Sequence, residues 1–215
     1  MNRKNALLSV SDRREIEKAA EILTKNGVAI WSSPGTASYL KNLGFSVLPV
    51  EELTGFSTLL QGRIKTLHPK IFGGILGRLK NPRDVSELQQ WGIPFFDVVI
   101  VNYYPFSRKK QENPPLDELL EYIDIGGPAM LRASAKNFPY SLPLFDPDDY
   151  VPVLSRWARG EITFRDRLHL ASKAFAYSVQ YDSEILLYFQ NLLSPDFPET
   201  FILTGTKIQQ NRYGE

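Results

Sequence analysis

The chain has no cysteine and almost no histidine, and these absences exclude several kinds of site. None of its 215 residues is cysteine. Disulfide bridges, thiolate zinc sites and a cysteine nucleophile are therefore excluded, and the composition is compatible with a reducing compartment. The two histidines, His68 and His169, lie far apart in unlike contexts. We therefore expect no metal centre built from histidine.

A strong net charge and long apolar runs are also missing. Lys and Arg total 25 against 24 for Asp and Glu, so no large field of one sign would hold the chain on nucleic acid or an anionic membrane. The apolar run at 6–8 is too brief for a signal peptide, and no run approaches the ~20 residues of a membrane span. We predict a cytoplasmic globular protein without nucleic-acid or membrane partners, in which a local site meets any anion.

Short apolar runs alternate with segments of helical periodicity over the first two thirds of the chain. The run at 96–101 is nearly unbroken and β-branched, as expected of a central strand buried on both faces. Pro143 predicts that the last strand lies at an edge. The alternation predicts an α/β fold with an open, mostly parallel sheet flanked by helices. Strands are predicted at 6–10, 28–31, 45–50, 96–101 and 142–145, and helices at 16–23, 37–43, 116–122 and 129–136.

The pattern changes at residue 149. Residues 163–193 form a long helical stretch, in which we expect a break near Asp182 and Ser183. No second sheet follows. We therefore predict an α/β domain at 1–148, a C-terminal helical extension of the same domain at 149–194, and a tail or linker at 195–215.

Two strand-to-helix loops are rich in hydroxyl groups. The first contains Ser11, Asp12 and Arg13, and the second contains Ser33, Pro34, Gly35 and Thr36. A helix N-terminus presents unpaired N–H groups and a partial positive charge, so two such loops side by side would form a phosphate site. Alternatively, Ser11 or Asp12 and Ser33 only cap their helices.

The segment 62–69 concentrates cationic side chains, Arg63, Lys65 and His68, between a glycine and a proline. This composition favours a fixed loop over a solvated helix face. Gly73 and Gly74 follow closely and suggest a tight approach of the backbone to something nearby. We interpret the segment as part of a site.

Three further segments carry candidate residues. Asn102 and Tyr104 follow the strand at 96–101, at the sheet edge where open α/β folds bind ligands. Asp124 lies between apolar residues and is either a helix cap or a buried functional acid. Lys136 ends a helix of small residues, where a lysine often only complements the helix dipole.

Taken together, these strings resemble the inosine monophosphate cyclohydrolase domain of the bifunctional purine biosynthesis enzyme. The resemblance runs in order from about residue 6 to the end of the chain. It rests on Ser-Val-Ser-Asp at 9–12, Gly-Thr-Ala at 35–37, Glu-Leu-Thr-Gly-Phe at 52–56, Gly-Arg-Ile-Lys-Thr-Leu-His-Pro at 62–69, Asn-Tyr-Tyr-Pro-Phe at 102–106, Ile-Asp-Ile-Gly-Gly-Pro-Ala-Met at 123–130, Ala-Lys-Asn at 135–137, Lys-Ala-Phe at 173–175 and Gln-Tyr-Asp at 180–182.

The resemblance implies a fold like that of methylglyoxal synthase and ring closure of 5-formamidoimidazole-4-carboxamide ribotide without cofactor or metal. It implies a catalytic group of Lys65, Tyr104, Asp124 and Lys136. We expect Lys136 to donate and accept protons, Asp124 to orient the amide, and Lys65 and Tyr104 to position or polarise the reacting groups. The implied nucleotide contacts are Ser11, Asp12, Arg13, Ser33, Pro34, Gly35, Thr36, Arg63, Ile64, Lys65, Thr66, Val101, Asn102, Asp124 and Ile125.

Three departures from the family pattern qualify these expectations. Arg13 stands where lysine is common, and Pro34 where glycine is usual. The formyltransferase half that follows in the family is absent, so we expect no formyl transfer from this chain alone. The family also implies a homodimer.

Two other functions share the predicted fold. A methylglyoxal synthase would use the same phosphate site but lacks the strings at 65–69 and 123–127. A regulatory domain like that of carbamoyl phosphate synthetases would need the phosphate site but not Lys65, Tyr104, Asp124 and Lys136.

Overall fold

A five-stranded sheet forms the centre of the structure. The computed structural model describes residues 4–193, 200 and 202–205. Every neighbouring pair of strands is parallel, which confirms the predicted α/β fold, and β5 lies at an edge, as Pro143 predicts. The strands are β1 Asn5–Ser9, β2 Ala29–Ser32, β3 Val47–Pro49, β4 Val98–Val101 and β5 Leu142–Leu144, in the order β3-β2-β1-β4-β5.

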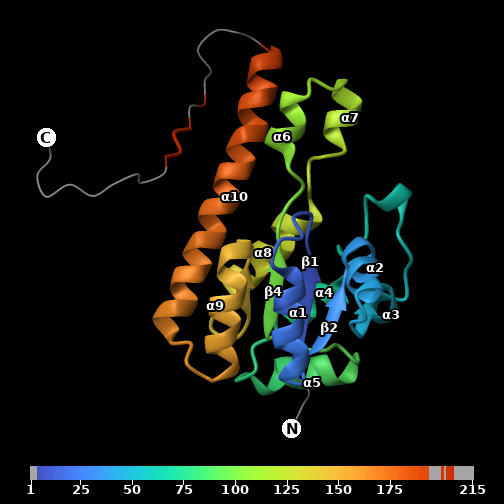
Figure 1. Ribbon diagram of the computed structural model, residues 1–215, viewed down its shortest axis with the longest axis vertical. Helices are drawn as coiled ribbons and strands as arrows, with labels where there is room; N and C mark the ends of the chain where they lie inside the picture. Colours follow the sequence, from blue (N-terminus) through green and yellow to red (C-terminus); the bar gives the residue numbers. More distant parts are fainter. Residues whose placement is uncertain (1–3, 194–199, 201, 206–215) are drawn as a thin grey trace, which may run out of the picture.

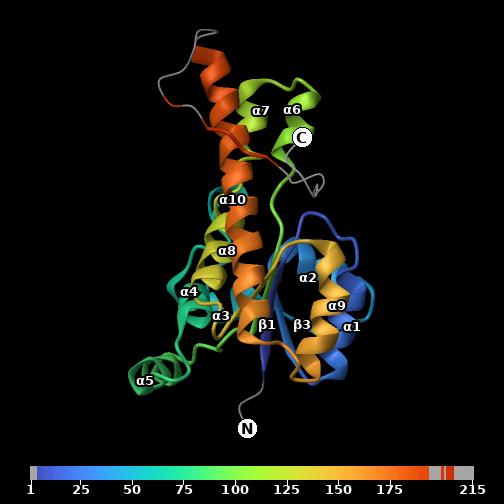
Figure 2. The same ribbon diagram turned by 90° about the vertical axis from the view of Figure 1, so that its left-hand side faces the viewer.

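Helices cover both faces of the sheet (Figure 1, Figure 2). Alternate residues of the inner strands point to opposite layers. Leu8 and Ile100 join one apolar cluster, whereas Leu7 and Val99 join the other. Burial on both faces explains why the sequence of β4 is continuously apolar. The first layer contains α1 Ile16–Lys25, α2 Pro34–Asn42 and α9 Pro147–Ala158, and the second contains α3 Val50–Thr54, α4 Pro69–Leu76, α8 Gly126–Lys136 and α10 Phe164–Leu193.

Shorter elements complete the fold. The 3₁₀ turn η1 Leu60–Gly62 precedes α4, and α5 Pro82–Gln90 follows it. Two more short helices, α6 Phe106–Gln111 and α7 Leu116–Leu120, lie beside the upper half of α10 (Figure 1). Of these helices the sequence pattern predicted only α7, because short helices bury few side chains. In α5, for example, the buried residue is Leu88 alone.

Two helices begin earlier than the sequence pattern predicts. α2 begins at Pro34, inside the predicted loop, because proline has a helical φ and its missing N–H would be unpaired at the first helical position. α8 begins at Gly126, inside the predicted turn at 123–127. Both predicted loops therefore contain the first turn of a helix.

The predicted break in the long C-terminal helix is wrong. α10 runs without interruption over 30 residues, a length of about 45 Å. Ser183, at the expected break, donates its hydroxyl to the carbonyl oxygen of Val179 at 2.6 Å. The helix thus satisfies this polar side chain internally.

The glycine pair at 73 and 74 serves packing and not the predicted site. A Cβ on Gly74 would lie 2.4 Å from the carbonyl oxygen of Pro94 and 2.8 Å from the ring of Phe96. The backbone of α4 therefore rests directly on the chain that enters β4. The expectation of a tight approach holds, but the partner is the protein itself.

Helices α9 and α10 pack directly on the sheet layers; α10 lies within the predicted extension at 149–194, and α9 begins two residues before it, at Pro147. Tyr150, Leu154 and Trp157 of α9 belong to the first apolar cluster, and Ala171, Ala174 and Tyr181 of α10 belong to the second. The predicted tail at 195–215 lies largely outside the described residues. In the described part of the chain, no helix combines the length and apolarity that a bilayer span requires.

Candidate active site

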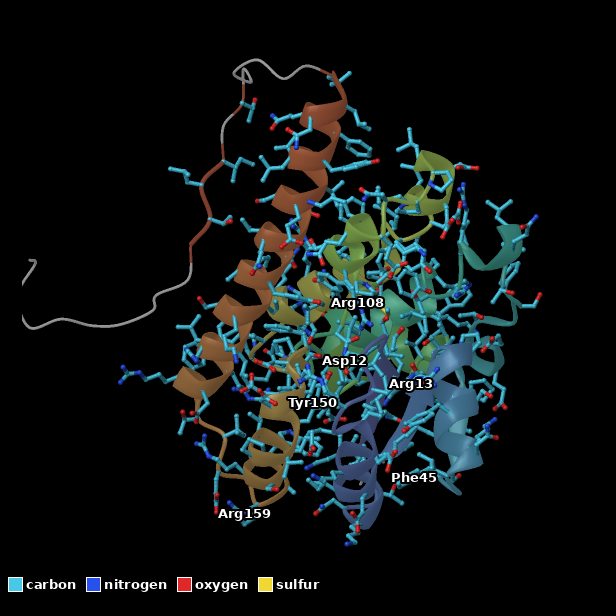
Figure 3. All side chains as sticks on the ribbon, turned by 45° about the horizontal axis from the view of Figure 1, so that its top comes forward. Asp12, Arg13, Phe45, Arg108, Tyr150 and Arg159 are labelled. Atoms are coloured by element: carbon cyan, nitrogen blue, oxygen red, sulfur yellow. The ribbon has the colours of Figure 1, made fainter. Side chains whose placement is uncertain are left out.

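A cavity of about 910 Å³ opens where the carboxyl ends of β1, β2 and β4 meet the N-terminal ends of α2 and α8. Its volume suits a small-molecule ligand. Figure 3 shows Asp12, Arg13 and Tyr150 at this upper end of the sheet, and Phe45 and Arg159 mark the opposite end. The predicted residues that line the cavity are Ser11, Arg13, Ser33, Gly35, Thr36, Arg63, Lys65, Thr66, Asn102, Tyr104, Asp124 and Ile125.

Four of the predicted nucleotide contacts do not line this cavity. The carboxylate of Asp12 pairs with the Arg14 guanidinium at 2.7 Å, and the hydrogen bond from Arg14 holds the pKa of Asp12 below its ordinary value. Val101 is fully buried in β4. Pro34 forms the first turn of α2, and Ile64 is half-buried in the loop before α4.

Lys136 lies apart from the other three residues of the predicted catalytic group. It ends α8, ten residues beyond Gly126 at the cavity, which corresponds to about 15 Å along the helix. There it borders a second, more apolar hollow with Phe138, Leu168 and Phe175. Asn137, which follows it, donates its side-chain amide to the carbonyl oxygens of Ile75 and Gly77. The structure thus brings Lys65, Tyr104 and Asp124 together without Lys136.

One end of the cavity is formed by the N-terminus of α2. The N–H groups of Gly35 and Thr36 have no hydrogen-bond partner among the described residues. Ser33 stands at the N-cap position, but its side chain does not cap the helix. Instead its Oγ accepts a hydrogen bond from the hydroxyl of Ser9 at 2.9 Å. Free N–H groups beside two hydroxyls form a site suited to an anion.

Asn102 shapes the neighbouring loop. Its Oδ1 accepts the N–H groups of Ser11 and Asp12 at 2.7 and 2.9 Å, so these two donors are already used. Its Nδ2 donates to the carbonyl oxygen of Asp12 and to the hydroxyl of Tyr150. Tyr150 is fully buried, and this burial raises its pKa. The loop is therefore held by side chains from β4 and α9.

Arg13 supplies a positive charge at the same end. Its guanidinium lies 4.5 Å from the centre of the Tyr39 ring, and the Tyr39 hydroxyl donates to Glu17. Stacking of this kind holds a cation in place while leaving its N–H groups free for a ligand.

The other end of the cavity holds Lys65, Tyr104 and Asp124. Lys65 Nζ lies 3.4 Å from the Tyr104 hydroxyl, and both side chains line the cavity. The Oδ1 of Asp124 accepts the N–H of Gly127 at 2.8 Å, so this acid is both a helix-end acceptor and a cavity residue. Burial raises the pKa of Asp124, although the nearby N–H groups and Lys65 oppose this change.

Gly127 is required by the position of that carboxylate. A Cβ at Gly127 would lie 2.5 Å from Asp124 Oδ2, which is too close for any side chain. The glycine string at 126–127 therefore allows Asp124 to sit against the start of α8.

Several cavity residues were not predicted. Glu121 is one of them: it forms an ion pair with the predicted Arg63, with Arg63 Nε 3.2 Å from Glu121 Oε2, and both side chains line the cavity. Ser9, Gln61 and Tyr122 also line it. Of these residues, Ser9 had a signal in the sequence, since it belongs to the hydroxyl-rich stretch that leads into Ser11. The described residues contain no group of three or more His, Cys, Asp or Glu side chains that could hold a metal ion.

Two family models match the chain. The model of the MGS-like domain matches residues 15–129, and that of the AICARFT/IMPCHase bienzyme matches residues 134–215. A solved structure titled "Crystal structure of ForH" is 38% identical, with a TM-score of 0.76, over 87% of this chain and 100% of the other.

Three similar curated proteins are each named bifunctional purine biosynthesis protein PurH. The relative from Aquifex aeolicus is 44% identical over 98% of this chain, and that from Persephonella marina is 44% identical over 100% of it. The relative from Oceanobacillus iheyensis is 41% identical over 99% of it. The chain spans 42% of the length of each of these relatives.

Proposed function

This chain belongs to the MGS-like domain family and corresponds to the inosine monophosphate cyclohydrolase part of PurH proteins, and we propose that it closes the second ring of a purine nucleotide. The proposed substrate is 5-formamidoimidazole-4-carboxamide ribotide, and the product is inosine monophosphate. The proposal draws on the predicted resemblance and on the two chemically different ends of one cavity.

The reaction is an intramolecular condensation. The carboxamide nitrogen attacks the formyl carbon and loses a proton, while the formyl oxygen gains negative charge and is protonated. The resulting hydroxyl then takes up a proton and leaves as water, and the former formamide nitrogen loses its proton as the ring C=N bond forms. An amide nitrogen is a poor nucleophile, so the site must accept a proton and stabilise the oxyanion.

The reacting end of the cavity offers groups that can stabilise the oxyanion and orient the amide. In the proposed mechanism, Lys65 and Tyr104 polarise the formyl oxygen, since they are adjacent donors facing the cavity. The Asp124 carboxylate accepts a hydrogen bond from the carboxamide N–H and so orients the carboxamide nitrogen toward the formyl carbon. Held by Gly127, this carboxylate needs little rearrangement when the substrate binds.

The other end of the cavity would bind the phosphate of the ribotide. The free N–H groups of Gly35 and Thr36, the hydroxyls of Ser9 and Ser33, and the stacked Arg13 together form the proposed phosphate site. One observation carries the proposal: this anion site and the Lys65, Tyr104 and Asp124 group share one cavity.

A direct assay tests the proposal. Purified protein should convert the formamido ribotide to inosine monophosphate in the presence of a chelator, measured by absorbance and by mass. Folded protein with no turnover above the uncatalysed rate refutes it. Formation of methylglyoxal from dihydroxyacetone phosphate would instead support the alternative synthase function. We expect no formyl transfer when a folate formyl donor is supplied to these residues alone.

The proposed proton-transfer role of Lys136 requires a second copy of the chain. About 15 Å of helix separates Lys136 from Gly126, which exceeds the reach of a lysine side chain. A catalytic Lys136 would therefore have to enter the cavity of a partner in the predicted homodimer.

Mixing two inactive variants tests this arrangement. If Lys136 acts across the dimer, combining Lys136→Ala with Asp124→Asn should restore up to about a quarter of the sites, because one site of each heterodimer has both residues. Variants that are inactive separately and also when mixed would refute the shared site. A Lys136→Ala variant with normal kcat would refute the catalytic role altogether.

A further inference from the structure

The middle of α10 packs against the segments that carry Tyr104 and Asp124. Tyr177, Ser178 and Tyr181 lie on one side of the helix, as expected for residues spaced three and four apart. None of the three lines the cavity. Each nevertheless hydrogen-bonds beside the cavity: Tyr177 accepts the N–H of Tyr103, Ser178 contacts the Tyr103 hydroxyl, and Tyr181 contacts the backbone of Asp124.

Tyr181 bridges two backbone groups of the turn that holds Asp124. Its hydroxyl accepts the N–H of Asp124 at 2.8 Å and donates to the carbonyl oxygen of Tyr122 at 3.0 Å. The Tyr181 side chain is buried, with 6% of its surface exposed, and burial raises its pKa. The hydroxyl therefore stays protonated and serves both bonds at once.

The same helix also holds the turn before Tyr104. The Tyr103 hydroxyl shares a hydrogen bond of 2.8 Å with Ser178 Oγ. The Tyr103 ring stacks on Tyr177 with centres 4.4 Å apart and meets the edge of Tyr181 at 4.9 Å. A single straight helix thus supports the backbone on both sides of the reacting end of the cavity.

From these contacts we infer that Tyr181 is a positioning residue for the reaction, which it supports by fixing the backbone of Asp124. The inference rests on the proposed function. Without the hydroxyl, the Asp124 N–H and the Tyr122 carbonyl would lose their partner in a partly buried place. The turn would then shift to find other partners, and the carboxylate would move with it. A phenylalanine ring at position 181 would fill the same space but could not hold the Asp124 backbone through hydrogen bonds.

The test compares two tyrosines on the same helix. Tyr181→Phe removes the bridging hydroxyl and keeps the ring. Tyr188→Phe is the matched control, since the Tyr188 ring packs on Phe106 and its hydroxyl has no hydrogen bond among the described residues. We expect Tyr181→Phe to lower kcat about tenfold, which is about 1.4 kcal/mol of barrier, with Tyr188→Phe unchanged. Binding of inosine monophosphate, measured by calorimetry, should change less than threefold in both variants.

A double-mutant cycle separates positioning from general loosening. In an Asp124→Asn background, single-turnover rates should fall less than twofold when Tyr181→Phe is added, because the residue through which Tyr181 acts is already impaired. The amide of Asp124 should exchange with solvent faster in Tyr181→Phe, as measured by nuclear magnetic resonance. This exchange measurement requires no turnover.

The outcomes distinguish the two proposals. If the wild-type protein turns over and Tyr181→Phe and Tyr188→Phe have equal kcat, the inference is overturned and the proposed function stands. The inference is also overturned if adding Tyr181→Phe to Asp124→Asn still lowers the single-turnover rate tenfold. A folded wild-type protein without activity overturns the proposed function and, with it, the role of Tyr181 in the reaction. Unchanged exchange of the Asp124 amide overturns the supporting role of the hydrogen bond.

Discussion

Replacing Gly127 by alanine should displace the Asp124 carboxylate by about 1 Å. An added Cβ would lie 2.5, 3.0 and 3.2 Å from Oδ2, Cγ and Oδ1 of Asp124, so its three nearest contacts all fall on this carboxyl group. Restoring an ordinary separation of about 3.4 Å from Oδ2 requires a shift of about 0.9 Å. A misplacement of this size in a reacting group typically costs about 10² in rate. We therefore expect Gly127→Ala to lower kcat roughly a hundredfold.

The substitution should do this with little change in global stability. Alanine favours the helix over glycine by up to about 1 kcal/mol, whereas losing the bond from the Gly127 N–H to Asp124 costs about 0.5–1.5 kcal/mol. These effects nearly cancel in the free energy of unfolding. The phosphate end is untouched, so the Kd for inosine monophosphate should stay within a few-fold.

Gly73→Ala provides the matched control. Gly73 is also helical, and a Cβ there would meet the flexible end of Ile93 at 3.3 Å, away from the cavity. The assay is steady-state kinetics of all three proteins, with urea denaturation to confirm folding. A Gly127→Ala kcat within threefold of the parent would refute the argument that the carboxylate position limits the rate.

Three further predictions concern binding and pH. Arg13→Ala should raise KM roughly tenfold or more with little change in kcat, since a charge-assisted phosphate bond worth about 1.5–3 kcal/mol is shared by ground and transition states; a fall in kcat alone would contradict this. Pro34→Gly should leave kcat and KM within a few-fold of the parent, because the N–H groups of Gly35 and Thr36 remain available. It should lower the free energy of unfolding by about 0.4–1 kcal/mol, because glycine gives the unfolded chain more freedom. A tenfold lower KM would show that the missing N–H of Pro34 impairs the site. Burial raises the pKa of Asp124, so kcat/KM should fall as pH drops through a value above the ordinary aspartate pKa, and Asp124→Asn should lack this limb; an acidic limb that is unchanged in that variant would assign it to another group.

Much of the fold could be predicted because the sheet is buried on both faces. Continuous apolar runs such as the one in β4 can only be accommodated inside an α/β sandwich, and Pro143 could only be tolerated at an edge. The missed features have local causes. The break expected at Ser183 overlooked the bond that its hydroxyl makes within α10. Short polar helices such as α5 leave too little periodicity to detect.

The candidate site was predicted less completely, because it depends on tertiary contacts between segments far apart in the sequence. Sequence patterns identified the loops that carry Thr36 and Tyr104 and the cationic segment that carries Lys65, and these three residues line one cavity. Such patterns cannot show that Asn102 already uses the N–H groups of Ser11 and Asp12. Nor can they give the direction in which α8 carries Lys136 away from its own cavity.

The contact between Tyr181 and the Asp124 turn has a consequence for the order in which the protein matures. A ribosome synthesises the chain from its N-terminus at roughly 5–20 residues per second, and N-terminal segments begin to fold first. The residues that line the cavity lie between 9 and 130, whereas the hydroxyl that holds Asp124 arrives only with residue 181. The sheet and the phosphate end can therefore form on a nascent chain before the reacting end reaches its final shape. Catalytic competence is expected to appear late in synthesis, after ligand-binding ability.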